Sequence, residues 1–342
     1  MTGFPEDQVN KKVGSIRDVA KETGLSIATI SRVMNGAPNV TSQTRQRVLD
    51  ASKKLDYLPN PAARALSTSK SKTIAAIIPT IEHSVFAKFI TAIEHQLAAC
   101  GYSLVLAISH GNFDEELTAA RKLLGMGAKA FILSGAHHSS DLLDLFERRR
   151  VPIVFTSVWD DSGTVPTVGY DNAALARNAV DYLISEGHRK IAVLHGPMGD
   201  SDRTVARRNG VLSALSDGLD LGFFETGLDV AGGKEAIRRV LDSGMGYTAA
   251  LCFSDVLALG TYFGLAEAGV RIPDKFSVMG FDNLDWSASV VPALTTIDLP
   301  AARMGANVAG QLVDLLENGA AISSLELTGQ IIERKSVSPP RQ

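Results

Sequence analysis

The sequence predicts an α-helical helix-turn-helix headpiece joined to an α/β body of two lobes, each a doubly wound parallel sheet. Three observations predict this architecture. Residues 15–35 carry two short apolar helical stripes separated by a glycine. From Thr73 onward, short apolar β-rich runs alternate with helical segments, which is typical of parallel sheets with helices on both faces. About 270 residues follow the headpiece, which is too many for one such sheet, so two lobes are expected.

The first predicted helix has a clear beginning and a clear end. Ser15 is followed three residues later by Asp18, the spacing of a capping box. Gly24 ends the helix, because a positive φ is least costly for glycine. The apolar residues at i, i+3 and i+4 form one stripe: Ile16, Val19 and Ala20.

A second helix follows after a tight turn. Ser26 is its predicted N-cap, and its apolar stripe is formed by Ile30, Val33 and Met34. The remaining face carries small or polar side chains, namely Ala28, Thr29, Ser31 and Arg32. In a helix-turn-helix unit this face enters the DNA major groove with its N-terminus first. An ordinary helical hairpin is the alternative, but the caps, the turn and the exposed face all agree with DNA binding.

A third helix and a proline-rich segment complete the N-terminal region. Thr41 opens the helix, whose apolar positions are Val48, Ala51 and Leu55. The segment after it contains Ala-Arg-x-Leu behind a proline, at residues 63–66. With the headpiece, this segment closely resembles the LacI/GalR family of bacterial transcription repressors. The resemblance extends over essentially the full chain from Ser15 onward.

The resemblance implies a body like that of periplasmic binding proteins, with chain crossings between lobes near Asp171, near Leu294–Ile297 and toward the C-terminus. The expected organisation is a flexible tail at 1–13, the headpiece at 14–58, a hinge helix and polar linker at 59–72, and the body at 73–342. Within the body, the expected proximal lobe comprises about 73–171 and 297–325. The expected distal lobe comprises about 172–296 and 326–342. Ligands bind beyond the carboxyl ends of such strands, so the two facing lobes predict one shared cleft.

The alternation within the body gives the following elements. The predicted strands are Ile74–Ile78, Leu104–Ile108, Ala130–Leu133, Ile153–Thr156, Ile191–His195, Ala249–Phe253 and Ser277–Phe281. The predicted helices include Phe86–Ala99, Glu115–Leu124, Ala173–Glu186, Arg203–Leu215, Gly233–Leu241 and Asp255–Ala268.

The resemblance assigns DNA-reading roles to the second helix. The residues that face base edges are Ile27, Ala28 and Arg32. An arginine at this place can donate two hydrogen bonds to guanine, whereas the two apolar side chains can only contact groups such as a thymine methyl. Phosphate contacts, which set the register, are expected from Ser15, Thr29, Ser31, Asn35 and Thr44. Hydroxyls on a solvated helix face are the alternative for this second set.

The hinge is the second expected DNA contact. In the family, the leucine that matches Leu66 wedges into the minor groove and kinks the duplex, with Ala63 and Arg64 beside it. A helix of about eight residues is too short to be stable alone in water. We therefore expect it to form with a dimer mate on a pseudo-palindromic DNA operator, in a homodimer or in a tetramer built from such dimers.

The resemblance also points to effector-binding positions in the cleft. Phe86 begins the first body helix, and Asp171 lies at the first crossing. Arg207 matches an arginine that often holds a carboxylate or a hydroxyl, for which a fixed fork of donors is suited. Asp282 follows a strand and can accept from sugar hydroxyls.

Two further cleft positions bear on which small molecule binds. Ser254 stands where many sugar-responsive members have asparagine, which departs from the usual pyranose-binding pattern. His138 follows the third strand, where it is either a ligand contact or an ordinary loop residue. Together with the segment from Asp200 to Thr204, these features resemble the gluconate-responsive branch, so the expected effector is a sugar or a sugar acid.

Charge and composition agree with a DNA-binding headpiece on an acidic body. Residues 1–72 hold 12 Lys and Arg against 6 Asp and Glu, whereas the remainder holds 22 against 31. No run of 18 apolar residues predicts a membrane span, and the N-terminus lacks the apolar core of a secretory signal. Two cysteines, Cys100 and Cys252, form no disulfide framework, so a cytoplasmic protein with two packing thiols is expected.

Other classes of function fit the sequence less well. No metal-ligand spacing, nucleophile elbow or Ser/His/Asp order is evident, so neither an enzyme, nor a metal site, nor a cofactor is expected. A periplasmic solute-binding protein would share the body but not the headpiece. A regulator of the same fold controlled by a protein partner remains the main alternative, and induction by the effector is favoured over co-repression.

Overall fold

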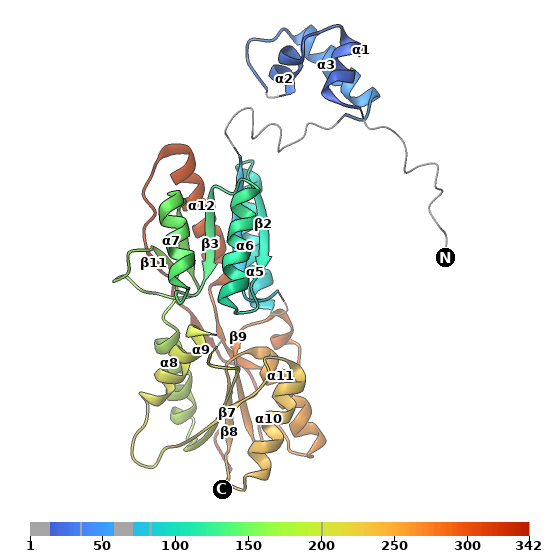
Figure 1. The fold of residues 1–342 in the computed structure, drawn as a ribbon. Helices are drawn as coiled ribbons and strands as arrows, with labels where there is room; N and C mark the ends of the chain where they lie inside the picture. The colour runs from blue at the N-terminus through green and yellow to red at the C-terminus, as the bar shows by residue number, and fades with distance from the viewer. Residues whose placement is uncertain (1–13, 35, 58–70, 82–83, 200, 342) are drawn as a thin grey trace. The chain divides into compact units, whose positions relative to one another are not determined.

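The structure is a computed structural model that describes residues 14–34, 36–57, 71–81, 84–199 and 201–341. The chain divides into two compact units, Met1–Ser71 and Lys72–Gln342 (Figure 1). The predictions for the tail at 1–13, for Asn35, and for the hinge with Ala63, Arg64 and Leu66 lie outside the described residues.

The headpiece contains the three predicted helices. They are α1 (Ile16–Thr23), α2 (Ile27–Met34) and α3 (Ser42–Lys54). The capping box at the start of α1 is confirmed, because the Ser15 side chain accepts from the Asp18 N–H while the Asp18 carboxylate accepts from the Ser15 N–H. Gly24 ends α1 with φ of 65°, which is the left-handed conformation that the turn requires.

A small apolar core holds the headpiece helices together. Its buried residues come from all three helices and are Val19, Ile30, Val33, Val48 and Ala51. Because these stripes face inward, the other side of each helix is left to solvent.

The first lobe of the body is a six-stranded sheet in the order β11-β5-β4-β3-β1-β2, and all its neighbouring strands are parallel. Its strands are β1 (Thr73–Ile78), β2 (Ser103–Ile108), β3 (Ala130–Ser134), β4 (Ile153–Thr156), β5 (Thr167–Gly169) and β11 (Leu325–Glu326). Its helices are α5 (Ser84–Ala99), α6 (Phe113–Gly125), α7 (Ser140–Arg149) and α12 (Ala301–Asn318).

The second lobe has the same plan, with the strand order β12-β10-β9-β8-β6-β7 and only β12 antiparallel to its neighbour within the described residues. Its strands are β6 (Lys190–His195), β7 (Asp220–Glu225), β8 (Ala249–Cys252), β9 (Ser277–Asp282), β10 (Thr295–Asp298) and β12 (Gln330–Ile332). Its helices are α8 (Asn172–Ser185), α9 (Asp202–Leu212), α10 (Val230–Asp242), α11 (Asp255–Glu267) and the 3₁₀ turn η2 (Asp285–Ala288).

Two crossings between the lobes fall later in the chain than expected. Ile297 and Asp298 pair with β9 and β12, so the second crossing follows Asp298 instead of preceding Ile297. Glu326 pairs with Gly169 in the first sheet, so the last crossing follows that residue. The hydrogen-bond ladders of the neighbouring strands decide these boundaries, and the local sequence does not contain that information.

The predicted body strands and helices are all present, but several elements had no sequence prediction. These are β5, β7, β10, β11, β12, α7 and α12. The largest cluster of buried apolar residues includes side chains of both lobes, such as Phe89 and Phe281. Of the two free cysteines, Cys252 is buried and Cys100 is half-buried.

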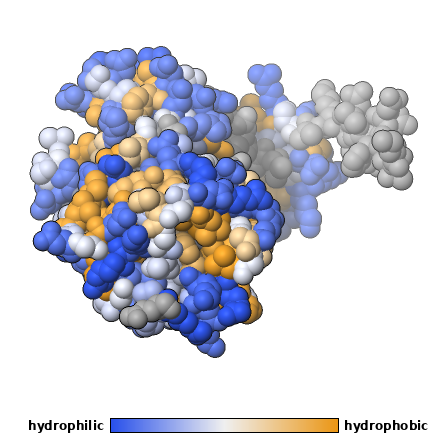
Figure 2. Space-filling model, turned by 90° about the horizontal axis from the view of Figure 1, so that it is seen from below, coloured by the Kyte–Doolittle hydropathy of each residue, from blue (hydrophilic) through white to orange (hydrophobic). Residues whose placement is uncertain are grey.

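The surface of the body is not uniformly polar. Figure 2 shows hydrophobic residues gathered among hydrophilic ones on the face seen from below. In the second lobe, the large apolar side chains that are exposed are Leu215, Met245, Phe263 and Val291, together with Val205. Among the described helices, none is long and apolar enough to cross a membrane.

Candidate functional site

Helix α2 presents the predicted base-reading residues to solvent. Ile30 and Val33 are buried in the headpiece core, whereas Ala28 and Arg32 are exposed and Ile27 is 46% exposed. Ile27 is not part of the headpiece core, so its side chain is available for the predicted contact with DNA.

Three of the residues predicted to contact phosphates, Ser15, Thr29 and Thr44, already take part in hydrogen bonds at helix caps. The Ser15 hydroxyl donates to Asp18, and Thr29 and Thr44 have hydroxyls 2.9 Å from those of Ser26 and Thr41, respectively. Ser31 is half-buried on α2. The hydroxyls of Ser15, Thr29 and Thr44 therefore help to fix the starts of the helices, and the contacts of all these residues with DNA remain predictions.

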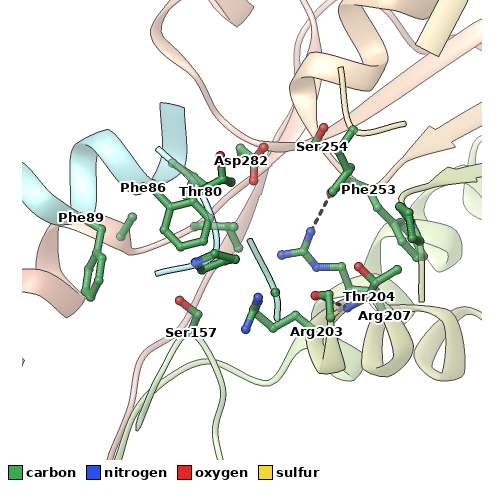
Figure 3. A pocket seen from close by; sticks show the side chains of 18 of the residues that line it. Thr80, Phe86, Phe89, Ser157, Arg203, Thr204, Arg207, Phe253, Ser254 and Asp282 are labelled. Atoms are coloured by element: carbon green, nitrogen blue, oxygen red, sulfur yellow. Dashed lines mark hydrogen bonds between the residues drawn. The ribbon is translucent and has the colours of Figure 1, made fainter. Parts of the chain in front are cut away.

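A cavity of about 400 Å³ lies between the two lobes. Its walls come from residues just after the carboxyl ends of strands in both sheets, for example Thr80 after β1, Ser157 after β4 and Ser254 after β8. This is where doubly wound sheets bind ligands. Figure 3 shows Phe86 of α5 on one side of the cavity and Arg203 and Arg207 of α9 on the other.

Arg207 is held by the protein on three sides. Its Nε donates to Asn172 Oδ1 at 3.0 Å, its Nη1 donates to the Phe253 carbonyl at 2.7 Å, and its guanidinium lies 4.0 Å from the centre of the Phe281 ring. Burial lowers the pKa of Arg207 from its ordinary value, although the neighbouring Tyr170 and Asp282 counteract this. Such a preorganised cation can bind a polar ligand without losing side-chain freedom.

Asp282 contributes a carboxylate to the cavity wall. Burial, followed by the charge of Asp255, raises the pKa of Asp282 to about 8. Asp255 lies behind it, fully buried, and accepts from the Leu284 N–H and from the hydroxyls of Ser287 and Thr296. Asp282 can therefore donate a hydrogen bond when protonated and accept one when ionised.

The structure brings together four of the six predicted effector residues. Phe86, Arg207, Ser254 and Asp282 line the large cavity. Phe86 belongs to the first lobe and the other three to the second, so a ligand touching Phe86 and Arg207 would contact both lobes. Ser254 also caps α11 by accepting from the Leu257 N–H at 3.2 Å.

The other two predicted effector residues do not line this cavity. The Asp171 carboxylate caps α8 by accepting from the Ala174 N–H at 2.9 Å. His138 lies 2% exposed, with Nδ1 3.0 Å from both oxygens of Glu116 and Nε2 3.2 Å from the Gly135 carbonyl. Asp171 thus caps a helix, and the His138 ring is hydrogen-bonded to Glu116; neither lines the large cavity, although His138 lines a smaller cavity beside it.

Several cavity residues had no sequence prediction. Arg203, Ser157, Tyr170, Phe253 and Met304 all contribute to the wall. Ser157 directly follows one predicted strand and Phe253 is the last residue of another, and these positions could have indicated them. Tyr170 and Met304 follow or begin elements that the sequence did not predict, so no local pattern marked them.

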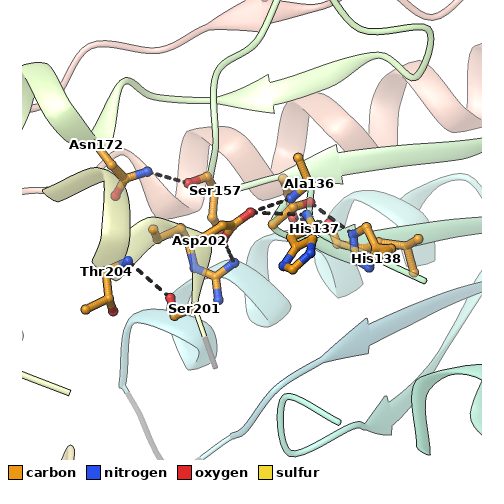
Figure 4. A network of polar contacts seen from close by, with 12 residues as sticks. Ala136, His137, His138, Ser157, Asn172, Ser201, Asp202 and Thr204 are labelled. Carbon is orange, nitrogen blue, oxygen red and sulfur yellow. Dashed lines mark hydrogen bonds and ion pairs between the residues drawn. The ribbon is translucent and has the colours of Figure 1, made fainter. Parts of the chain in front are cut away.

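Polar contacts also link the two lobes around the cavity. Asn172 donates to the Ser157 carbonyl at 2.8 Å, and Asp202 accepts from backbone N–H groups of the first lobe (Figure 4). Lys88 of α5 donates to the Asn283 carbonyl at 2.9 Å and lies 2.8 Å from Asp285. In the part of the chain that the structure describes, no group of three His, Cys, Asp or Glu residues could hold a metal ion.

Comparison with known proteins agrees with this two-part arrangement. Residues 15–60 match the family described as bacterial regulatory proteins, lacI family, and residues 71–335 match periplasmic binding proteins and sugar binding domain of LacI family. The chain belongs to the LacI family. It is therefore a DNA-binding transcription regulator with a sugar-binding effector domain, and its relatives are regulators and repressors, not enzymes.

Individual relatives match the LacI-family chain over nearly its whole length. The catabolite control protein A of Priestia megaterium is 32% identical over 314 residues, covering 91% of this chain and 94% of the relative. The transcriptional repressor PurR of Proteus mirabilis is 30% identical over 333 residues, covering 95% and 97%.

Solved structures of the family show the same fold. The lac repressor dimer bound to operator and the anti-inducer ONPF superimposes with a TM-score of 0.84 at 26% identity, covering 96% of this chain and all of that one. The complex of the regulator CelR with cellobiose has a TM-score of 0.69 at 26% identity, covering 94% and 99%.

Proposed function

We propose that this LacI-family regulator represses a sugar or sugar-acid catabolic operon and that a small-molecule effector bound between the lobes releases it from its operator. The observation that carries this proposal is the cavity of about 400 Å³, which has an aromatic wall from one lobe and arginines from the other. Apolar walls with a few fixed polar groups are typical of small-molecule sites.

On the DNA side, the protein acts as a homodimer on a pseudo-palindromic operator. Each α2 enters a major groove, where Arg32 reads a guanine. The hinge pairs with its dimer mate, and Leu66 wedges into the minor groove with Ala63 and Arg64 beside it. The exposed apolar side chains of the second lobe, such as Phe263 and Val291, supply surface that a second copy could cover.

The effector acts by changing the angle between the lobes. A ligand that contacts Phe86 and Arg207 touches one lobe with each residue, so its binding energy depends on how the lobes face each other. Only a difference in affinity between two arrangements can shift the equilibrium between them. The arrangement favoured by the effector separates the paired hinges and weakens DNA binding.

Control by a protein partner is the less well supported alternative. A regulator of that kind would have little use for a roomy cleft with charged side chains in its wall, whereas this cleft holds Arg203, Arg207 and Asp282. Arg207 and Asp282 both belong to the second lobe, so the pair does not itself bridge the cleft. The links across the cleft are made by other residues, among them Lys88 and Asp202.

The first experiment is a thermal-shift screen of the full chain against neutral sugars and sugar acids. A ligand at 100 times its Kd stabilises the native state by about 2.7 kcal/mol, which is readily measured. The ligand found in the screen is then titrated into a complex of the protein with operator DNA. We expect DNA release; tighter binding would instead show co-repression.

The matched variants for this titration are Arg207→Ala and Arg208→Ala. Arg208 follows on the same helix but stacks on Phe223, with 4.7 Å between guanidinium and ring centre, and does not line the cavity. We expect Arg207→Ala to bind operator like the wild type and to lose the effector response, while Arg208→Ala keeps both. A response of Arg207→Ala at the wild-type effector concentration would contradict the proposed site.

A further inference from the structure

A second, smaller cavity adjoins the effector cavity. It has a volume of about 40 Å³ and a mostly polar lining that includes Ser134, His137 and Glu116. Arg203 and Ser201 line both cavities, so the two spaces meet at the start of α9. A group on a ligand in the large cavity could therefore reach the small one past the Arg203 side chain.

The two arginines of the cleft, Arg203 and Arg207, differ in how many hydrogen bonds they make within the protein. Arg207 donates to Asn172 and to the Phe253 carbonyl and stacks on Phe281. Arg203, within the part of the chain that the structure describes, donates one hydrogen bond, from its Nη1 to Asp202 Oδ1 at 3.1 Å. A guanidinium has five N–H donors, so Arg203 keeps more of them for a ligand than Arg207 does.

The position of Arg203 is fixed from the opposite lobe. Its partner Asp202 accepts at Oδ2 from the N–H groups of Ala136 at 2.7 Å and His137 at 3.3 Å (Figure 4). Gly135, with φ of 93°, permits this approach, because a Cβ there would lie 2.6 Å from Arg203 Nη1. The Arg203 side chain is consequently only 13% exposed although it carries a charge.

The small cavity offers donors more than acceptors. Its two carboxylates are already engaged, since Glu116 pairs with His138 and Asp202 pairs with Arg203 and two N–H groups. The Ser134 hydroxyl oxygen, by contrast, is buried and has no hydrogen-bond partner among the residues that the structure describes. A buried polar group of this kind costs stability until a ligand or a water satisfies it.

We propose that Arg203 is the residue by which this regulator selects acidic effectors. The carboxylate of a bound sugar acid accepts from the Arg203 guanidinium where the two cavities meet, and the Ser134 hydroxyl donates to the same group. Arg207 then holds the uncharged, hydroxyl-bearing part of the ligand. This inference rests on the proposed effector cavity, but it assigns recognition of the acid to Arg203 instead of Arg207.

The test is titration calorimetry of the full chain with gluconate and glucitol, which differ only in having a carboxylate or a CH₂OH group at one end. We expect the wild type to bind gluconate at least about tenfold more tightly, the size of one charge-assisted hydrogen bond. Arg203→Gln should lose this preference while glucitol affinity changes less than about threefold. Arg203→Lys, which keeps the charge without the fork, should retain part of it.

Two further variants complete the design. Ser134→Ala should weaken gluconate by about threefold and leave glucitol unchanged, since it removes one neutral donor. Arg208→Gln, outside both cavities, should alter neither ligand. The operator affinity and melting temperature of each variant show that it is folded.

Three results would overturn the inference. If Arg203→Gln weakened both ligands equally, Arg203 would serve only the contact between lobes. If Arg203→Gln retained the wild-type preference for gluconate over glucitol, another residue would bind the carboxylate. If the wild type bound glucitol or neutral sugars as tightly as any acid, the site would not select acids. The proposed function as a sugar-responsive regulator would not be affected by that result.

Discussion

The headpiece and the effector cleft place their functional side chains in opposite environments. In the headpiece, five buried apolar residues form the core, and Ile27 and Arg32, which are predicted to contact DNA, take no part in it. In the cleft, Asp282 is buried and Arg207 half-buried, and both are hydrogen-bonded to residues that shape the lobe. Recognition is thus separate from folding in the headpiece and combined with it in the cleft.

This difference determines what substitutions can teach. A change on the exposed face of α2 should remove the predicted contacts with DNA and little else, because surface substitutions usually alter stability by less than about 0.5 kcal/mol. A change in the cleft should remove a proposed ligand contact together with an internal hydrogen bond. Experiments on the cleft therefore need a control for folding, whereas experiments on α2 report recognition directly.

The largest expected effect is on the body. Asp255→Ala would leave the Leu284 N–H and the hydroxyls of Ser287 and Thr296 buried without their acceptor. We expect the free energy of unfolding of the body to fall by about 3–5 kcal/mol, as for other broken buried networks. Urea unfolding followed by tryptophan fluorescence measures it, with Val291→Ala, at a 91% exposed position of the same body, as a control that should change by less than about 0.5 kcal/mol. A loss for Asp255→Ala as small as that of the control would contradict the comparison.

The second effect is on DNA binding. Arg32→Ala should weaken binding to the true operator by about 1–3 kcal/mol and relax discrimination at one guanine, because a bidentate contact is lost. Its thermal unfolding should match that of the wild type, since Arg32 is exposed. Fluorescence anisotropy on operator and on random DNA measures the difference. An equal loss of affinity for operator and for random DNA would show that Arg32 contacts a phosphate and not a base.

The third effect is on the pH dependence of stability. The pKa of Asp282 rises from 3.8 to about 8 on folding, so the folded protein keeps a proton that the unfolded chain releases. The free energy of unfolding should therefore fall as the pH rises from about 4 to about 8, by up to about 1.4 kcal/mol per pH unit from this group. Urea unfolding of wild type and Asp282→Asn across this range should show a smaller fall in the variant. Identical slopes would mean that Asp282 ionises normally.

The smallest effect is at the start of α1. Ser15→Ala removes the side-chain half of the capping box and should destabilise the headpiece by about 1 kcal/mol. Amide hydrogen exchange in α1 measures the loss, and operator affinity measured in parallel tests the predicted phosphate contact. Unchanged hydrogen exchange together with weaker DNA binding would show that the Ser15 hydroxyl contributes more to the contact with DNA than to the stability of α1.

Local sequence was enough to predict the headpiece and most of the sheets. Ser15, Gly24 and Thr41 act within three or four residues of themselves, so their capping roles could be inferred from spacing alone. Apolar runs such as Ile153–Thr156 predicted a strand with its observed bounds. These inferences succeed because caps and apolar periodicity are short-range properties of the chain.

Only the tertiary structure decided how the cleft is built. Asp202 meets the N–H of Ala136 across 66 residues of sequence, and Gly135 makes room for Arg203 at that contact. The same kind of long-range packing turned His138 toward Glu116 and placed Ile297 in the second sheet. The sequence predicts polar candidate residues after strands. Which of these residues share a cavity depends on the strand order and on the contacts between the lobes. No local sequence pattern determines either of these.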